Sequence, residues 1–459
     1  MLLLACAAAC SWAQGDPAVI DKIIEEGKTR NQTRAHLEYL TEQIGARLTS
    51  SLALQKACDW TQSMFESFGL TAHQEKWGEW PVGFDRGRTH VGRMVMPYER
   101  NFEFTTRSWT PGTNGLKRGR AVIAPETAEE VMAHPGRYNG SWVLMPALPR
   151  RASAEVRAAR AEIWDAIKAN HPLGQVSGSR NELVLTSGRF NVEWDDRPTG
   201  VAIIIRKGDY DAVVAEVEAG RTAILEFNLN QKMRKGPIPI YNVIAEIRGT
   251  ELPDEVVIVS GHLDSWDGPG SVGACDNGTG TMVALEAARL LMAAGAKPKR
   301  TIRFIMWTGE EQGLWGSREY VKMHEDELSK ISAVLVDDGG TNYSGGLVCI
   351  ESMVPMLQQA IDPLTEAFPD LRVTLRVRER MPRGGGSDHA SFNRVGVPGF
   401  FWTETGVADY QYIHHTQHDK LTAAINRYLV QSSVAAAVTA FNLACADTML
   451  PRQPKADGN

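Results

Sequence analysis

The chain has 459 residues, which is enough for two or three domains with a sizeable core. Its hydrophobic content of 43% and charged content of 23% are typical of soluble globular proteins. A net charge of -6 without a long basic run argues against a nucleic-acid partner, and no apolar run reaches the roughly 18 residues that a membrane span needs.

Residues 1–13 predict an export signal, because they are apolar, rich in small residues and end in Ser-Trp-Ala, a small-x-small cleavage site. The expected location is therefore secreted or periplasmic. The stretch is short and lacks a basic region, which fits a truncated signal, and a disordered tail is the alternative. Cys6 follows Leu-Leu-Ala as in a lipoprotein cleavage site, which leaves a lipid anchor open. The cysteines after the signal have no spacing typical of a zinc knuckle or a disulfide framework, and their pairing cannot be deduced: Cys58, Cys275, Cys349 and Cys445.

The next part of the chain changes character twice. Residues 16–70 have apolar residues at helical spacing, and residues 75–110 have the aromatics, Gly and Pro of short strands and loops, ending in a linker at 109–115. Residues 116–236 contain short β-rich runs and one charged, Ala-rich helix at about 152–168, which indicates a small, mainly β domain. We therefore divide the chain into a main domain formed by residues 14–111 and 237–459, with an inserted domain at residues 112–236.

Strands alternate with helices in the last part of the chain. Strands are expected at residues 241–247, 256–260, 302–307, 333–336 and 397–402, and helices at 283–294 and 420–446. This alternation predicts an α/β fold with a central, mostly parallel sheet flanked by helices.

Acidic residues or histidines follow three of these strands. His262 and Asp264 follow the first, residues 310–311 (Glu-Glu) the second, and residues 337–338 (Asp-Asp) the third, while Asp276 lies at a helix entrance. Parallel strands place such residues at one edge of the sheet. Clustered carboxylates repel one another unless cations neutralise them, and mixed histidine and carboxylate ligands suit zinc.

Four ordered motifs resemble the signature of the co-catalytic zinc exopeptidases, the family of bacterial leucyl aminopeptidases and glutamate carboxypeptidases. They are residues 261–265 (Gly-His-Leu-Asp-Ser), 276–277 (Asp-Asn), 309–311 (Gly-Glu-Glu) and 415–416 (His-Thr). The resemblance covers about residues 34–110 and 238–450, and residues between them match the inserted protease-associated domain of the family more loosely. It implies a hydrolase of short peptides with two zinc ions, and it leaves open a homodimer.

The resemblance also implies a role for each matching residue. His262 and Asp338 would bind one zinc, Glu311 and His415 the other, and Asp276 would bridge both. Asp264 would hold the other ring nitrogen of His262, and Asp419 could do the same for His415. The peptide bond after Asp276 is cis in the family.

Glu310 would be the general base that activates a metal-bridging water and returns the proton to the leaving amine. A pair of acids favouring the dipole of a helix start is the alternative for Glu310 and Glu311. Asp337 is an alternative ligand to Asp338. His414 and His418 flank His415, but only His415 directly precedes threonine as in the family, so His414 is expected to form a pocket wall.

Residues 383–389 (Arg-Gly-Gly-Gly-Ser-Asp-His) resemble the family's glycine-rich loop near the substrate. Some relatives carry a tyrosine for oxyanion binding where this chain has a glycine, about at Gly384, so the oxyanion donor is open. Arg378, Arg380 or Arg383 could bind a substrate carboxylate, with a solvated arginine face as the alternative. The residues expected at the substrate are Arg383, Gly385, Ser387, Asp388 and His414.

The leading hypothesis is a di-zinc exopeptidase for dipeptides or short peptides, with carboxypeptidase or dipeptidase polarity slightly favoured over aminopeptidase polarity. A receptor-like binding protein of the same fold is the alternative from another class, but such receptors have lost their metal ligands, whereas every ligand position is filled here. The complete two-metal set and the inserted domain also disfavour a single-zinc glutaminyl cyclase.

Overall fold

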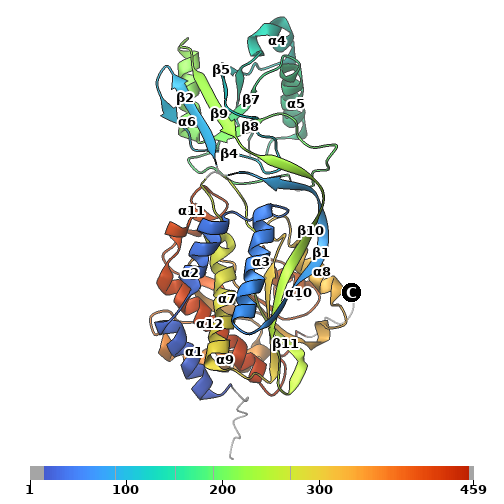
Figure 1. Ribbon diagram of the computed structural model, residues 1–459, viewed down its shortest axis with the longest axis vertical. Coiled ribbons are helices and arrows are strands. Elements are labelled where there is room, and N and C mark those ends of the chain that lie inside the picture. The colour runs from blue at the N-terminus through green and yellow to red at the C-terminus, as the bar shows by residue number, and fades with distance from the viewer. Residues whose placement is uncertain (1–14, 88, 150, 190, 269, 454–459) are drawn as a thin grey trace, which may run out of the picture.

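Two sheets, one in each of two lobes, organise the chain in the computed structural model (Figure 1). The structure describes residues 15–453 except for 88, 150, 190 and 269. The predicted export signal with Cys6 therefore lies outside the described residues.

The lower lobe in Figure 1 is built on a six-stranded sheet. Four neighbouring strands are parallel and the two others are antiparallel, which confirms the mostly parallel core that the sequence predicts. The strands, in spatial order, are β1 (Thr71–Asp85), β10 (Lys232–Ile247), β12 (Arg300–Trp307), β11 (Leu252–His262), β13 (Ile331–Val336) and β16 (Gly399–Phe401). A smaller sheet beside it contains β15 (Thr374–Val377), β14 (Tyr343–Cys349) and β17 (Thr403–Thr405).

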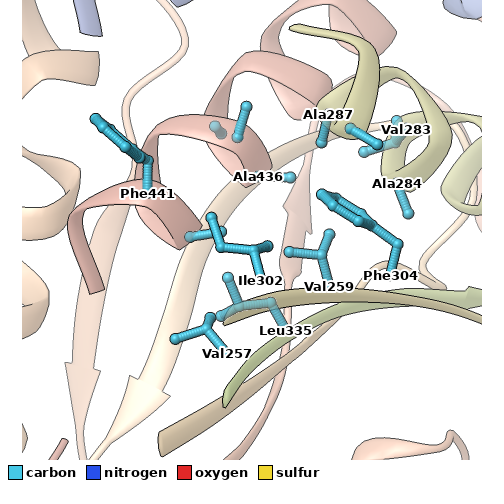
Figure 2. Close-up of a cluster of buried hydrophobic side chains, with 14 of the residues drawn as sticks. Val257, Val259, Val283, Ala284, Ala287, Ile302, Phe304, Leu335, Ala436 and Phe441 are labelled. Carbon is cyan, nitrogen blue, oxygen red and sulfur yellow. The ribbon is translucent and has the colours of Figure 1, made fainter. Parts of the chain in front are cut away.

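Helices cover both faces of this sheet, because its central strands bury side chains on both sides. Val257 and Val259 pack with α7, α9 and α12 on one face, and Ile258 packs with α8 and α10 on the other. Figure 2 shows the first of these clusters, with Phe304 and Ala436 among its members. The helices of this lobe are α1 (Pro17–Thr29), α2 (Thr33–Glu38), α3 (Leu52–Ser67), α7 (Thr279–Ala294), α8 (Trp315–Met323), α9 (Val354–Ala367), α10 (His389–Arg394), α11 (Tyr410–Ile413) and α12 (Asn426–Cys445).

Helix α12 is the one described helix that is long and apolar enough to cross a membrane, and 94% of its apolar window is buried inside the protein. It packs in the main core with α7 and α9, so its composition is that of a core helix. Helix α7 ends at Gly295, whose φ of 71° is the left-handed geometry that glycine adopts readily, as the sequence predicts.

The upper lobe contains an eight-stranded sheet with three helices, α4 (Ala128–Ala133), α5 (Ala154–Lys168) and α6 (Lys207–Glu218). Its core is rich in aromatic residues, including Trp142 and Phe227. The strands, in spatial order, are β3 (Arg100–Asn101), β2 (His90–Met96), β9 (Ile224–Leu229), β5 (Lys117–Ile123), β6 (Trp142–Met145), β7 (Gly174–Gly178), β8 (Ala202–Ile205) and β4 (Phe104–Thr106).

The second sheet begins earlier in the chain than the segment 112–236 that we expected to form the inserted domain. Strand β2 pairs with β9 from His90 opposite Leu229 onward, so residues from 90 belong to this sheet. The expected linker at 109–115 also differs, because Trp109 is fully buried and donates to the carbonyl of Val82. Its ring stacks on Trp80, which anchors this stretch between the lobes. The division into domains itself stays a prediction.

Strands β1 and β10 connect the lobes. Both are longer than the short strands expected from the sequence, and they pair continuously from Thr71 opposite Glu246 to Asp85 opposite Lys232 apart from two irregularities. Figure 1 shows the pair running from the lower lobe up to the second sheet. The four described cysteines are free and buried.

The core assignment predicts the effect of one truncation. Phe304 is fully buried, so Phe304→Ala should lower the free energy of unfolding by about 3–5 kcal/mol. Val407 is 82% exposed, so Val407→Ala should change it by about 0.5 kcal/mol or less. Urea unfolding followed by circular dichroism measures both, and equal midpoints for the two variants would contradict the assignment.

Candidate metal centre

The five side chains predicted as metal ligands come together at the carboxyl edge of the main sheet. His262 ends β11, Glu311 follows β12, and Asp338 follows β13. Asp276 lies in the irregular turn Ala274–Gly278 before α7, and His415 follows α11. The register of β11 with β12 and β13 aligns these strand ends, which explains why residues far apart in sequence meet here.

The distances show one continuous cluster. His262 Nε2 lies 3.0 Å from Asp338 Oδ1 and 3.4 Å from Asp276 Oδ1. The other oxygen of Asp276, Oδ2, lies 3.1 Å from His415 Nε2. His415 Nε2 lies 2.9 Å from Glu311 Oε2. The two oxygens of Asp276 therefore face different histidines.

The electrostatics of the cluster favour a bound cation. Burial, with the neighbouring Asp276 carboxylate, raises the pKa of Glu311 to about 7. Burial lowers the pKa of His415, but Glu311 and Asp276 outweigh it and raise the value to about 11. Asp276 Oδ2 is inaccessible to solvent, and its one close polar neighbour in the described part of the chain is His415 Nε2 at 3.1 Å, without the angle of a good hydrogen bond. His262, Asp276 and Asp338 could hold a metal ion, as could Asp276, His414 and His415, so the residues present fit the cations that the sequence suggests.

Asp264 lies beneath the cluster and holds the other ring nitrogen of His262, as predicted, but through its backbone carbonyl. His262 Nδ1 lies 3.0 Å from the backbone carbonyl of Asp264 and 3.7 Å from its carboxylate, beyond hydrogen-bond distance. The carboxylate accepts the backbone N–H of Glu310 at 3.2 Å and of Glu311 at 3.3 Å. Asp264 therefore fixes the turn that carries both glutamates, because adjacent N–H groups bind its two oxygens.

Glu310 lies beside His262 at the cluster. Its Oε2 is 3.9 Å from His262 Nε2, and the residue is 8% exposed. Burial raises the pKa of Glu310 well above its ordinary value, although the charge of His262 opposes the shift. Asp338 and Asp388 raise it further, because their negative charges disfavour another nearby carboxylate.

The structure separates the two candidate ligands after β13. Asp338 contacts His262, whereas Asp337 lies beside Glu404. Burial raises the pKa of Glu404 well above its ordinary value, and the charge of Asp337 raises it further. Glu404 also accepts the backbone N–H of Gly339 at 3.1 Å. Asp337 and Glu404 therefore surround the turn that presents Asp338, and the sequence gives no spacing that points to Glu404.

Asp419 does not hold His415 in the way that its position four residues later suggested. Its Oδ1 accepts the backbone N–H of Cys275 at 2.6 Å, so it supports the turn of Asp276 instead. The peptide bond between Asp276 and Asn277 is cis, as the resemblance implies.

The first part of the glycine-rich loop, up to residue 386, is exposed, and its last part is buried. Ser387 and Asp388 are buried, and burial raises the pKa of Asp388 to about 7, with the charge of His262 opposing the shift. Gly385 is exposed and lies against the ring of His389. The loop borders a cavity of about 310 Å³ lined by Val348, Pro382, Gly384, Gly386, His389, Gly399, Phe400, Phe401 and Thr403.

The other two substrate-binding candidates lie in different places. Arg383 is exposed and lines a separate cavity of about 80 Å³ with Arg394 and Gln453. His414 lies at the metal cluster, with Nε2 3.8 Å from Asp276 Oδ2 and its ring stacked on His415 and Tyr410. Of Arg383 and His414, only His414 therefore lies at the metal cluster.

Sequence reasoning missed Arg47, which is fully buried below the cluster. Its guanidinium donates to the backbone carbonyls of Leu263 at 2.7 Å and Gly273 at 2.7 Å, and so joins the loops that carry Asp264 and Asp276. Burial lowers the pKa of Arg47 to about 10, against the opposing effect of the nearby carboxylates. No spacing in the sequence distinguishes this arginine from a surface one.

Comparison with known proteins agrees with this geometry. The profile of peptidase family M28 matches residues 242–440. Human carboxypeptidase Q is 34% identical over 439 residues, which cover 93% of this chain and 88% of that protein. Mouse carboxypeptidase Q is 35% identical over 212 residues, 46% of this chain and 43% of the mouse protein.

Two solved structures resemble the whole chain. A peptidase M28 precursor from Shewanella amazonensis has a TM-score of 0.66 at 24% identity, covering 95% of this chain and 98% of that one. A zinc aminopeptidase from Bacillus subtilis has a TM-score of 0.56 at 19% identity, covering 92% and 98%. At these identities the likeness concerns the fold.

The burial of Asp419 predicts that the free energy of unfolding of the metal-free protein depends on pH. Burial raises its pKa to about 8, so its neutral form stabilises the fold at low pH and this stabilisation is lost as the pH rises towards 8. Asp419→Asn keeps an acceptor for Cys275 N–H and does not ionise. The free energy of unfolding should therefore fall more steeply for the wild type than for the variant, by on the order of 1 kcal/mol per pH unit between pH 5 and 8.

Urea unfolding in a chelator at pH 5, 6.5 and 8 measures this difference. The other buried acids are common to both proteins, so they cancel in the comparison. Parallel pH profiles for the wild type and Asp419→Asn would contradict an uncharged, buried Asp419.

Proposed function

Since the chain belongs to peptidase family M28 and is a metallo-exopeptidase, we propose that it hydrolyses dipeptides or short peptides with two zinc ions. The observation that carries the proposal is the position of Asp276, whose Oδ1 faces His262 and whose Oδ2 faces His415. A carboxylate in this position can bridge two cations. Mixed histidine and carboxylate ligands are a usual set for zinc.

The proposed ligands of one zinc are His262 and Asp338, and those of the other are Glu311 and His415, with Asp276 shared. Bound zinc supplies an acidified water and a Lewis acid for the scissile carbonyl. Asp264 contributes by fixing the backbone of Glu311, and the carbonyl of Asp264 orients the His262 ring.

Glu310 is the proposed general base. A buried carboxyl with a raised pKa can take the proton of the attacking water and return it to the leaving amine nitrogen. The hydrogen bond from its backbone N–H to the Asp264 carboxylate fixes the position of the Glu310 backbone, from which the side chain extends. Its Oε2 lies 3.9 Å from His262 Nε2, which places it beside the proposed metal ligands.

The cavity beside the glycine-rich loop is the proposed site for one substrate side chain. Its volume of about 310 Å³ suits a single residue, and Val348 and Phe401 give it apolar walls. The loop that contains Gly385, Ser387 and Asp388 contributes Gly384 and Gly386 to the lining, which supports a proposed contact of this loop with substrate. His414 lies at the metal cluster, which supports its own proposed contact. The placement of Arg383 in another cavity weakens its proposed role in binding a substrate carboxylate.

Carboxypeptidase or dipeptidase polarity is the slightly favoured form of this proposal. Human carboxypeptidase Q, a relative at 34% identity, supports it. The zinc aminopeptidase of Bacillus subtilis supports the opposite polarity, but at 19% identity its likeness concerns the fold. A protease-associated nature of the upper lobe and export directed by residues 1–13 are further proposals.

Replacing Glu310 by glutamine tests the general base. Glu310→Gln should keep the zinc content of the wild type and lower kcat by about a hundred- to ten-thousand-fold, because the base is lost and the ligands remain. Metal analysis and peptide hydrolysis on the same sample measure both effects. Glu351→Gln, at an exposed glutamate, is the matched control and should leave kcat unchanged. Substantial peptidase activity in Glu310→Gln would show that another group is the base.

A panel of blocked dipeptides tests the polarity. A carboxypeptidase should cleave acetylated dipeptides with a free carboxylate and spare amidated ones, an aminopeptidase should do the opposite, and a dipeptidase should need both free ends. Released amino acids are quantified, with Glu310→Gln protein as the control for contaminating peptidases. Cleavage of amidated but not acetylated substrates would reject the favoured polarity.

A further inference from the structure

The upper lobe reaches the metal centre through residues 182–188, which lie between β7 and β8 and which we call the bridging segment. Thr186 of this segment donates its backbone N–H to the carbonyl of His415 at 2.8 Å. Leu185 forms an antiparallel bridge with Thr416. One proposed metal ligand is therefore held by backbone pairing with the other lobe.

Gln417 extends the same connection. Its side chain is 6% exposed, and its Oε1 accepts the backbone N–H of Val184 at 2.7 Å. Its Nε2 donates to the carbonyl of Glu182 at 3.1 Å and to a carboxylate oxygen of Glu103 at 3.3 Å. All these partners belong to the upper lobe or to the turn that leads into β4. The loop of His415 is thus bound to the upper lobe by main chain and side chain.

A second connection reaches the loop after β11. Asp267 accepts hydrogen bonds from Arg86 at 2.8 Å and from Ser108 at 2.5 Å, and the ion pair of Asp267 with Arg86 is buried. Next to it, Trp266 donates its backbone N–H to Glu311 Oε1 at 3.0 Å, and its ring lies edge-on to that of His415. The two unshared ligands of the second proposed zinc, Glu311 and His415, are therefore attached to the upper lobe or to the segments that lead into and out of it.

The other half of the cluster is fixed within the lower lobe. His262 belongs to β11, and its Nδ1 lies 3.0 Å from the carbonyl of Asp264. Asp338 follows β13, and Glu404 holds the next residue, Gly339, by its backbone N–H. These contacts do not involve the upper lobe.

We propose that the bridging segment positions His415, and that the loop of Trp266 and Asp267 positions Glu311, while the His262 and Asp338 half of the centre is independent of both connections. The upper lobe then sets the affinity of one cation selectively. This inference rests on the proposed two-zinc function. It makes the inserted segment a part of the metal centre.

Two variants of the full chain remove the connection from opposite sides. Thr186→Pro deletes the N–H that binds His415, and Gln417→Ala deletes the amide that binds the bridging segment. Asn442→Ala is the matched control, since Asn442 is a buried amide that binds the carbonyl of Ala360, which lies on α9. Each protein is stripped of metal and titrated with zinc against a competing chelator, and its thermal unfolding is measured without metal.

Thr186→Pro and Gln417→Ala should each lower the affinity for one zinc by about 10- to 100-fold and leave the affinity for the other unchanged, because removing a contact that orients a metal ligand typically has an effect of this size. Hydrogen exchange should also increase at residues 413–419, while Asn442→Ala should bind both ions as the wild type does. Equal weakening of both sites, or unchanged binding in both variants, would overturn the inference. A wild type that binds fewer than two zinc ions would instead contradict the proposed function on which the inference rests.

Discussion

Mutual repulsion of buried carboxylates is the constraint on which the centre depends. Asp276, Glu311 and Asp338 meet at one sheet edge with Glu310 beside them, and each is at most one-tenth exposed. Such a group is stable only when protons or cations balance its charge. In the metal-free protein the two histidines and a raised glutamate pKa provide this balance, and the same positions could instead hold metal ions.

The surroundings of the ligands serve this charge distribution. Arg47 places a guanidinium under the cluster and binds the carbonyls of two ligand-bearing loops, so one buried cation both orders backbone and offsets negative charge. Asp264 does the converse, because its carboxylate orders the backbone N–H groups of Glu310 and Glu311. The framework of the site is therefore made of charged side chains bound to main chain, which gives fixed geometry at the sheet edge.

The sequence predicts the sheet, and the acids and histidine at its edge, because both depend on local features, whereas the full ligand set with His415 depended on the resemblance to the zinc exopeptidases. Apolar runs mark the strands, and the residues that end them are adjacent to those runs. Asp264 binds the predicted ring nitrogen of His262, but through its carbonyl. Asp419 binds a different partner from the predicted one, because the direction of a side chain depends on tertiary packing, which spacing along the chain does not contain. The start of the second sheet was missed for a similar reason: β2 pairs with β9, a strand more than a hundred residues away, and nothing within β2 indicates that partner.

Arg47 and Glu404 show the same limit for the site. Both act through contacts with backbone of distant loops, so neither belongs to a recognisable motif. The bridging segment is another case, since its pairing with residues 415–417 is irregular and too short to produce a strand pattern. Residues that carry chemistry were thus easier to predict than residues that hold them in place.

The long ladder between β1 and β10 has a consequence for how substrates reach the centre. A hinge between lobes normally lies in a few residues whose backbone rotates freely, but here a hydrogen-bonded ribbon crosses the junction. Swinging the lobes apart would break that ribbon together with the pairing of Thr186 and His415. We therefore expect the two lobes to keep one relative orientation while substrates bind and products leave, with no large opening and closing of the lobes in the catalytic cycle.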